Sequence, residues 1–213
     1  MGMHRMGPPE NVVLALGKEL GIRHFVESGT HLGGTANWAA NHFERVTTME
    51  LSPHFHAEAS KRLAARSQVR LLCGDSGKLL REIVGEMKGP AIFWLDAHWS
   101  GGETAGEDAE CPVLLEIEEV NKSPLENVIL VDDARLFCAP PPRPHKADQW
   151  PELATLLTAL DAGTRRYVVL FEDVLVAVPV SARGFFSAWL QDAATQAQAA
   201  PSKPAPLWRR VFG

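Results

Sequence analysis

Acidic residues follow one apolar run after another along this chain. Five such runs end in an aspartate or a glutamate: Phe25-Val26-Glu27, Thr47-Thr48-Met49-Glu50, Leu71-Leu72-Cys73-Gly74-Asp75, Phe93-Trp94-Leu95-Asp96 and Ile129-Leu130-Val131-Asp132-Asp133. Apolar runs of this kind are typical of buried parallel strands, and open α/β sheets bind their ligands at the carboxyl ends of the strands. The acids therefore predict a crevice that holds a molecule with hydroxyls, amines, positive charge or a metal ion.

The last two runs bring three carboxylates to one place. Asp96 ends one predicted strand, and Asp132 and Asp133 end the next. Three carboxylates cannot all ionise side by side without a cation. Mg²⁺ binds a few carboxylates and leaves positions for water or a substrate oxygen. We therefore expect a hard divalent ion here, Mg²⁺ or else Mn²⁺ or Ca²⁺.

His98 lies two residues after Asp96. Its unperturbed pKa of about 6.5 lets an imidazole take a proton near neutrality, so His98 is the candidate general base. The alternatives are that it contacts the metal or bonds to a loop carboxylate.

A glycine-rich turn follows the first acid and reads Gly29-x-x-x-Gly33-Gly34. It lacks the G-x-G-x-x-G spacing that places a pyrophosphate on a helix N-terminus, and Glu27, separated from Gly29 only by Ser28, would repel a phosphate. The turn therefore favours a cationic ligand without phosphate.

Two further acids extend this half of the crevice. Glu50 lies 21 residues after Gly29, close to the position at which ribose hydroxyls are held in dinucleotide-binding folds. Asp75 is either the N-cap of the next helix or a ligand residue, and one aspartate can do both.

The apolar patterns predict seven strands and the helices between them. The strands are 24–27, 46–50, 69–73, 91–96, 128–132, 167–171 and 174–178. The helices are 11–20, one that follows the glycine turn and ends at about 44, 53–66, 76–87, 112–121, 150–161 and 183–199. Alternating strands and helices form a doubly wound sheet. The last two strands are too close for a helix between them and must pair antiparallel. The predicted fold is α/β and Rossmann-like, a seven-stranded sheet that is mostly parallel with one antiparallel terminal strand.

Length and composition point to one domain. With 213 residues, the chain divides into an N-terminal helix segment (1–21), a core (22–180) and a C-terminal helix and tail (181–213). The net charge of −5 and the lack of a basic cluster argue against nucleic acid, and no apolar run is long enough for a membrane span. Cys73, Cys111 and Cys138 form no metal or disulfide pattern. We expect a cytoplasmic protein with Cys73 in the core. The first helix and the Trp208/Phe212 tail either cover the sheet or form a homodimer contact.

With these elements the chain resembles the class I S-adenosylmethionine-dependent methyltransferases over roughly residues 24–180. The trio Glu27, Glu50 and Asp75 is similar to the first three motifs of that family. The resemblance implies an S-adenosylmethionine site built from Glu27, Gly29, Thr30, Gly33, Thr35, Glu50, Asp75, Ser76 and Asp96.

The second half of the pattern is similar to the metal-dependent sugar O-methyltransferases of macrolide and aminocoumarin biosynthesis. In those enzymes one aspartate after the fourth strand and a pair after the fifth hold the metal, which implies Asp96, Asp132 and Asp133 here. They carry an aspartate where this chain has His98, which leaves the assignment of the base open. The resemblance implies metal-dependent O-methyl transfer to a hydroxyl of a small molecule or sugar.

Other function classes stay open. A methyltransferase without metal would use the aspartate pair to support His98, and a nucleoside-binding protein would need no chemistry. A nicotinamide oxidoreductase lacks its phosphate turn. Asp96-Ala97-His98 also occurs in metal-dependent ureohydrolases, but Ser100 stands where they have a second aspartate.

Two long loops, 97–111 and 134–148, flank the predicted metal and are expected to act as lids or binding loops. We expect the following residues as candidates for the acceptor pocket: Trp99, Arg135, His145 and Trp150, the last of which is alternatively a core anchor at a helix start. The acids Glu103, Glu107, Asp108 and Glu110 are expected to form a solvated stretch.

Overall fold

The computed structural model describes residues 7–99 and 109–199. Seven strands form one sheet in the order β3-β2-β1-β4-β5-β7-β6. The strands are β1 (His24–Ser28), β2 (Arg45–Glu50), β3 (Val69–Cys73), β4 (Ala91–Leu95), β5 (Val128–Val131), β6 (Arg166–Phe171) and β7 (Val174–Pro179). The helices around them are α1 (Glu10–Glu19), α2 (Gly34–Ala39), α3 (Pro53–Leu63), α4 (Ser76–Glu86), α5 (Val113–Asn121), α6 (Arg135–Cys138) and α7 (Leu153–Leu160).

The strand pairing confirms the predicted fold class. Strands β1 to β5 run parallel, and β7 pairs antiparallel with both β5 and β6. The order of the parallel strands reverses at β1, between β2 and β4. Ligands of open α/β sheets bind at such a reversal, outside the carboxyl ends of the strands.

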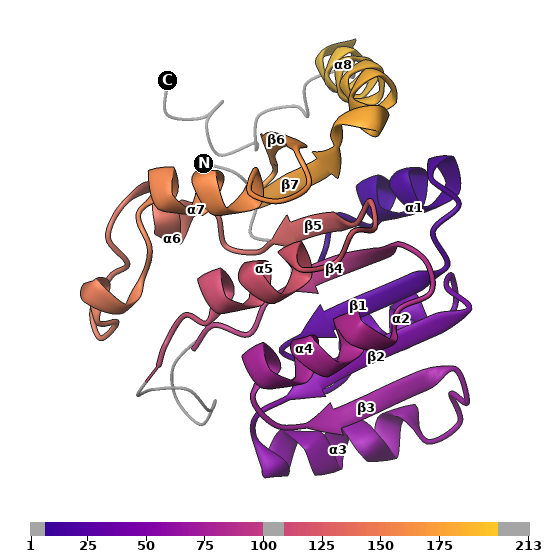
Figure 1. Cartoon of the computed structure of the whole chain (residues 1–213), viewed down its shortest axis with the longest axis vertical. Coiled ribbons are helices and arrows are strands. Elements are labelled where there is room, and N and C mark those ends of the chain that lie inside the picture. The colour runs from indigo at the N-terminus through magenta and orange to yellow at the C-terminus, as the bar shows by residue number, and fades with distance from the viewer. Residues whose placement is uncertain (1–6, 100–108, 200–213) are drawn as a thin grey trace, which may run out of the picture. The chain divides into compact units, whose positions relative to one another are not determined.

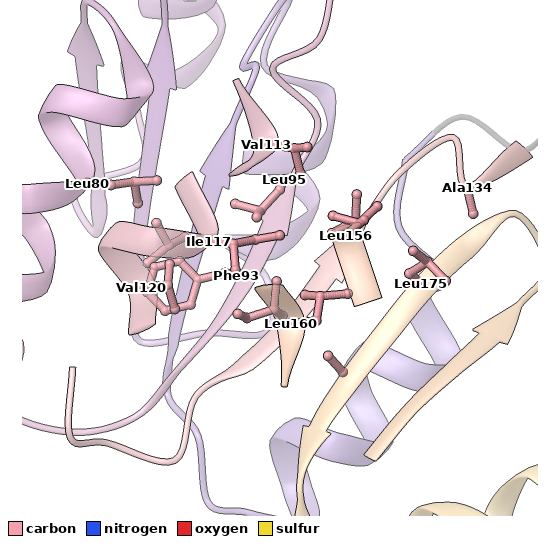
Figure 2. Packing of buried hydrophobic residues seen from close by; sticks show 14 of the residues in the cluster. Leu80, Phe93, Leu95, Val113, Ile117, Val120, Ala134, Leu156, Leu160 and Leu175 are labelled. Atoms are coloured by element: carbon pink, nitrogen blue, oxygen red, sulfur yellow. The ribbon is translucent and has the colours of Figure 1, made fainter. Parts of the chain in front are cut away.

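Helices cover both faces of the sheet (Figure 1). Helices α4, α5 and α7 pack in one layer, and α2 and α3 contact each other and the β2–β3 side of the sheet. Figure 2 shows side chains from α4, α5 and α7 meeting those of β4. This core includes Leu80, Phe93, Leu95, Ile117, Val120, Leu156 and Leu160, all buried. On β1, Phe25 instead packs against the rings of Trp38 and Phe43.

Three details differ from the sequence-based expectations. The helix after the glycine turn ends at Ala39, earlier than expected, and a short unpredicted helix, α6, interrupts the loop after β5. Cys73 is exposed, so its assignment to the core was wrong. The strand that carries it, β3, lies at the edge of the sheet, where it has a neighbour on one side only.

The C-terminal part, residues 181–213, forms a unit of its own. It contains α8 (Arg183–Ala199), in which the rings of Phe186 and Trp189 stack. The expectations for Trp208 and Phe212, and those for Ser100, Glu103, Glu107 and Asp108, lie outside the described residues. None of the helices in the described ranges has the length and apolar character to cross a bilayer.

Gly29 allows the ends of β1 and β4 to meet. Its φ is +83°, and a Cβ built on it would lie 2.2 Å from the carbonyl oxygen of Asp96. That oxygen belongs to the backbone and cannot swing away, so the position accepts no side chain without moving a strand end. The close approach sets where Asp96 stands relative to the glycine turn.

We predict that Gly29→Ala lowers the free energy of unfolding by at least about 2 kcal/mol, since it combines left-handed strain with a backbone clash. Gly85→Ala is the matched control, because no atom lies within 4 Å of its added methyl and alanine favours a helix. Urea denaturation measures both variants. Equal stability of Gly29→Ala and wild type would contradict the clash.

Candidate functional site

A cleft of about 1150 Å³ opens at the carboxyl ends of the parallel strands. Small-molecule sites commonly measure about 300–1,000 Å³, so this cleft has room for two ligands side by side. Its walls include most of the predicted site residues: Gly29, Thr30, Thr35, Glu50, Asp75, Ser76, Asp96, His98, Asp132 and Asp133. Glu27 and Gly33 are the two predicted residues that do not line it.

Gly33 serves the turn itself. It is the N-terminal cap residue of α2 with φ +74°, and a Cβ there would approach Leu63 of α3 to 3.3 Å. Its lack of a side chain thus lets α2 pack closely on α3.

Glu50 is held by the backbone around it. One carboxylate oxygen accepts the His31 N–H at 2.7 Å, and the other accepts the Ser52 N–H at 2.8 Å. The residue is largely buried and lies in the cleft wall. The remaining lone pairs of both oxygens can accept from ligand hydroxyls.

Asp75 caps α4, since its side chain accepts the Lys78 N–H at 3.3 Å. It also lies in the cleft wall and is half-exposed. Ser76, next to it, is buried and hydrogen-bonds to Glu116 of α5. The structure therefore gives Asp75 the capping role and leaves it accessible to a ligand.

Glu27 lies beneath the cleft rather than in its wall. The carboxyl is 1% exposed and accepts the Thr48 hydroxyl at 2.6 Å, and the Thr30 hydroxyl is 2.5 Å from that of Thr48. Burial raises the pKa of Glu27 to about 8 against the opposing hydrogen bonds from Thr48 and Thr35. Glu27 thus carries a proton at neutral pH and touches the cleft through threonine hydroxyls.

His98 forms a pair with Asp133. Its Nε2 is 3.0 Å from Asp133 Oδ2, and its Nδ1 is 3.7 Å from Asp96 Oδ1. Burial alone would raise the pKa of Asp133, but the hydrogen bond from His98 and the guanidinium of Arg135 lower it to about 2. An ionised carboxylate only accepts, so Nε2 carries a hydrogen and, in the neutral ring, Nδ1 carries the lone pair.

Asp173 is a site residue that the sequence analysis missed. It lies in the turn between β6 and β7 and accepts the Arg135 N–H at 2.9 Å, while its carbonyl accepts the Ala134 N–H at 2.8 Å. Arg135 bridges Asp173 and Asp133 with its guanidinium. The hairpin turn thereby holds the loop that carries the aspartate pair, at a sequence separation that no local pattern reveals.

The negative charges of Asp96 and Asp132 are stabilised less by neighbouring groups than that of Asp133. Burial, followed by the charge of Asp132, raises the pKa of Asp96 well above its usual value. Burial and the charge of Asp133 raise the pKa of Asp132 to about 6. A cation between these two groups would relieve both the desolvation and the repulsion.

Asp96 and Asp132 offer two carboxylates, the kind of ligand that a hard divalent ion prefers. Within residues 7–99 and 109–199, no three of the histidine, cysteine, aspartate and glutamate side chains group closely enough to hold a metal. Both oxygens of Asp133 face His98 and Arg135. Mg²⁺ is often bound through one or two protein carboxylates and keeps several waters, which fits Asp96 and Asp132.

Of the four residues expected at an acceptor pocket, only Arg135 lines the cleft. Trp99 and Trp150 are buried, and the ring centroids of Trp150 and His98 are 5.4 Å apart. Trp150 precedes α7, in agreement with its alternative role as a core anchor. Glu110 is fully buried, so its assignment to a solvated stretch was wrong; its carboxylate accepts hydrogen bonds from the second long loop.

No protein-family profile matches this chain. No curated protein sequence matches it either. Solved structures match its fold. A candidate O-methyltransferase from Klebsiella pneumoniae is 16% identical over 83% of this chain and 82% of its own, with a TM-score of 0.61. An O-methyltransferase from Bacillus cereus in complex with S-adenosylhomocysteine is 18% identical over 82% and 83%, with a TM-score of 0.56. A Podospora anserina methyltransferase with bound S-adenosylhomocysteine is 17% identical over 82% and 80%, also at 0.56. The chain has the class I methyltransferase fold.

Glu27 makes stability depend on pH. The unfolded chain loses this proton near pH 4.5, whereas the folded chain keeps it until about pH 8. The folded state binds one more proton across that window, so its stability falls as the pH rises, by about 1.4 kcal/mol per pH unit. We predict that Glu27→Gln removes this part of the slope in denaturation measured without ligand between pH 5 and 8. The exposed Glu82→Gln is the control, and an unchanged slope in Glu27→Gln would refute the assignment.

Proposed function

We propose that this protein is an S-adenosylmethionine-dependent O-methyltransferase that acts on a hydroxyl of a small molecule or sugar. The observation that carries the proposal is the pairing of His98 with Asp133 in the same cleft as Glu50, at the strand reversal of a class I methyltransferase fold. Two structures of similar fold contain S-adenosylhomocysteine, the product of such a reaction, which supports the choice of methyl donor.

The β1–β2 side of the cleft suits S-adenosylmethionine. Glu50 offers carboxylate oxygens to ribose hydroxyls, and Asp75 lies one strand farther along, where it can accept from an adenine amine. Gly29, which has no side chain, lets the backbone of the turn lie close to the ligand, and Thr30 lines the cleft next to it. The proton on Glu27 also keeps the region beneath the cleft uncharged until a cationic ligand binds.

The β4–β5 side of the cleft provides the base. In our proposal, the acceptor hydroxyl gives its proton to Nδ1 of His98, and the oxygen attacks the sulfonium methyl in line. The S–CH₃ bond breaks as the O–CH₃ bond forms, and the sulfur leaves as a neutral thioether. Asp133 then stabilises the imidazolium through Nε2. Alignment of the two reactants supplies much of the rate.

Metal dependence is the second part of the proposal. Asp96 and Asp132 would hold Mg²⁺, or Mn²⁺ or Ca²⁺ in its place, and the ion would act as a Lewis acid that lowers the pKa of the acceptor hydroxyl. Asp133 would join them only by releasing His98 or Arg135. Asp133 already bonds to His98 and Arg135, and this observation favours the alternative, a methyltransferase that needs no metal.

The donor is tested by calorimetric titration of S-adenosylmethionine and of NAD into the chelated protein, with and without Mg²⁺. We predict micromolar binding of S-adenosylmethionine, about −8 kcal/mol, and none of NAD. Methyl transfer is then measured on diols and sugars. No binding of S-adenosylmethionine in either condition would sink the proposal, and binding without turnover on any acceptor would favour the nucleoside-binding alternative.

The metal is tested by titrating Mg²⁺ into the complex with S-adenosylhomocysteine. We predict that Asp96→Asn and Asp132→Asn each weaken Mg²⁺ binding at least about 10-fold, because each removes a charged ligand. The exposed Asp192→Asn should bind Mg²⁺ like wild type. Equal Mg²⁺ affinity in all variants, together with full turnover in the presence of chelator, would contradict the metal site and favour the metal-independent alternative.

A further inference from the structure

Glu110 is a buried carboxylate in contact with the second long loop. Its side chain is 0% exposed. The carboxylate accepts the indole N–H of Trp150 at 2.8 Å and the backbone N–H of Lys146 at 3.0 and 3.1 Å, and His145 Nδ1 is 3.2 Å away. Burying an ionised carboxylate costs much free energy unless hydrogen bonds satisfy it, and here they come from the short stretch 145–150 that precedes α7.

The backbone of Glu110 makes two more connections. Its N–H donates to Gln149 Oε1 at 2.9 Å, and its carbonyl accepts the N–H of Trp99 at 2.7 Å. Trp99 directly follows His98 in the chain. Glu110 therefore joins the end of the first long loop, the stretch 145–150 before α7, and the residue next to the proposed base.

Aromatic rings continue the connection to His98. The Trp150 ring, held at its N–H by Glu110, has its centroid 5.4 Å from that of His98 and 5.6 Å from that of Phe137. His145, the other ring at the carboxylate, contacts both Trp99 and Trp150. The imidazole thus meets Asp133 at Nε2 and a tryptophan fixed by Glu110 beside its ring.

We propose that Glu110 is a positioning residue for His98. It orients the imidazole through two routes, the Trp150 ring and the Trp99 backbone, and so holds Nδ1 near Asp96 on the β4–β5 side of the cleft. Glu110 does not touch the reacting atoms. The inference rests on the proposed function only for its kinetic consequence, since the orientation of the imidazole is a property of the free protein.

The test compares Glu110→Gln with Glu119→Gln. Glu119 is also a largely buried glutamate held by hydrogen bonds, but its partners are Arg81 and Lys122, outside the cleft. The first readout is the ¹⁵N spectrum of the His98 imidazole, assigned by its loss in His98→Asn. We expect one tautomer, protonated at Nε2, in wild type and in Glu119→Gln, and a broadened or averaged signal in Glu110→Gln.

The second readout is kinetic. We expect kcat of Glu110→Gln to fall roughly 100-fold, as for a misplaced catalytic group, with the affinity for S-adenosylhomocysteine unchanged. If Glu110→Gln does not fold, Trp150→Phe keeps a ring beside His98 but lacks the indole N–H, and the same changes are expected in it. A folded Glu110→Gln with the wild-type His98 signal overturns the proposal. If wild type transfers no methyl group, the proposed function fails, while the imidazole spectrum still decides the role of Glu110.

Discussion

Carboxylates held close together out of water impose the main constraint on this molecule. Like charges repel more strongly as the surroundings become less polar, and each ionised acid also loses hydration. The protein meets this cost in different ways at different positions. Glu27 keeps its proton, and Asp133 is ionised between His98 and Arg135. Asp96 and Asp132 are stabilised less, and burial keeps the pKa of both raised, which makes their side of the cleft the place where a positive charge is most favourable.

The sheet sets the positions of these acids through its own hydrogen-bond ladder. The N–H of Asp96 donates to the carbonyl of Ser28, and the N–H of Asp132 donates to that of Leu95. The acids therefore lie on the last rungs of the parallel pairing, not on free loops. Side chains on strand ends are placed more accurately than side chains on loops, so the spacing of the cluster follows from the register of β1, β4 and β5. The loops add the remaining contacts, through Asp173 and Glu110.

The sequence predicted what depends on local pattern and missed what depends on pairing between loops. Apolar runs revealed all seven strands, and an acid after each of the first five revealed which edge would carry the site. Glu110 and Asp173 have partners 35 to 40 residues away, and no periodicity marks such contacts. Glu110 was misread because its neighbours in the sequence are acidic, which suggested a solvated stretch. Cys73 was misread because a strand pattern does not tell an edge strand from a central one.

The fixed position of the Glu50 carboxylate affects the entropy of ligand binding. A glutamate side chain in solution samples many rotamers, and fixing one when a ligand binds costs about 0.5–1.5 kcal/mol. The N–H groups of His31 and Ser52 hold this carboxylate from both sides before any ligand arrives. The free energy needed to fix the Glu50 rotamer is therefore spent when the chain folds, not when the ligand binds. A hydroxyl that reaches Glu50 finds an acceptor already in position, so more of the interaction energy is available as affinity.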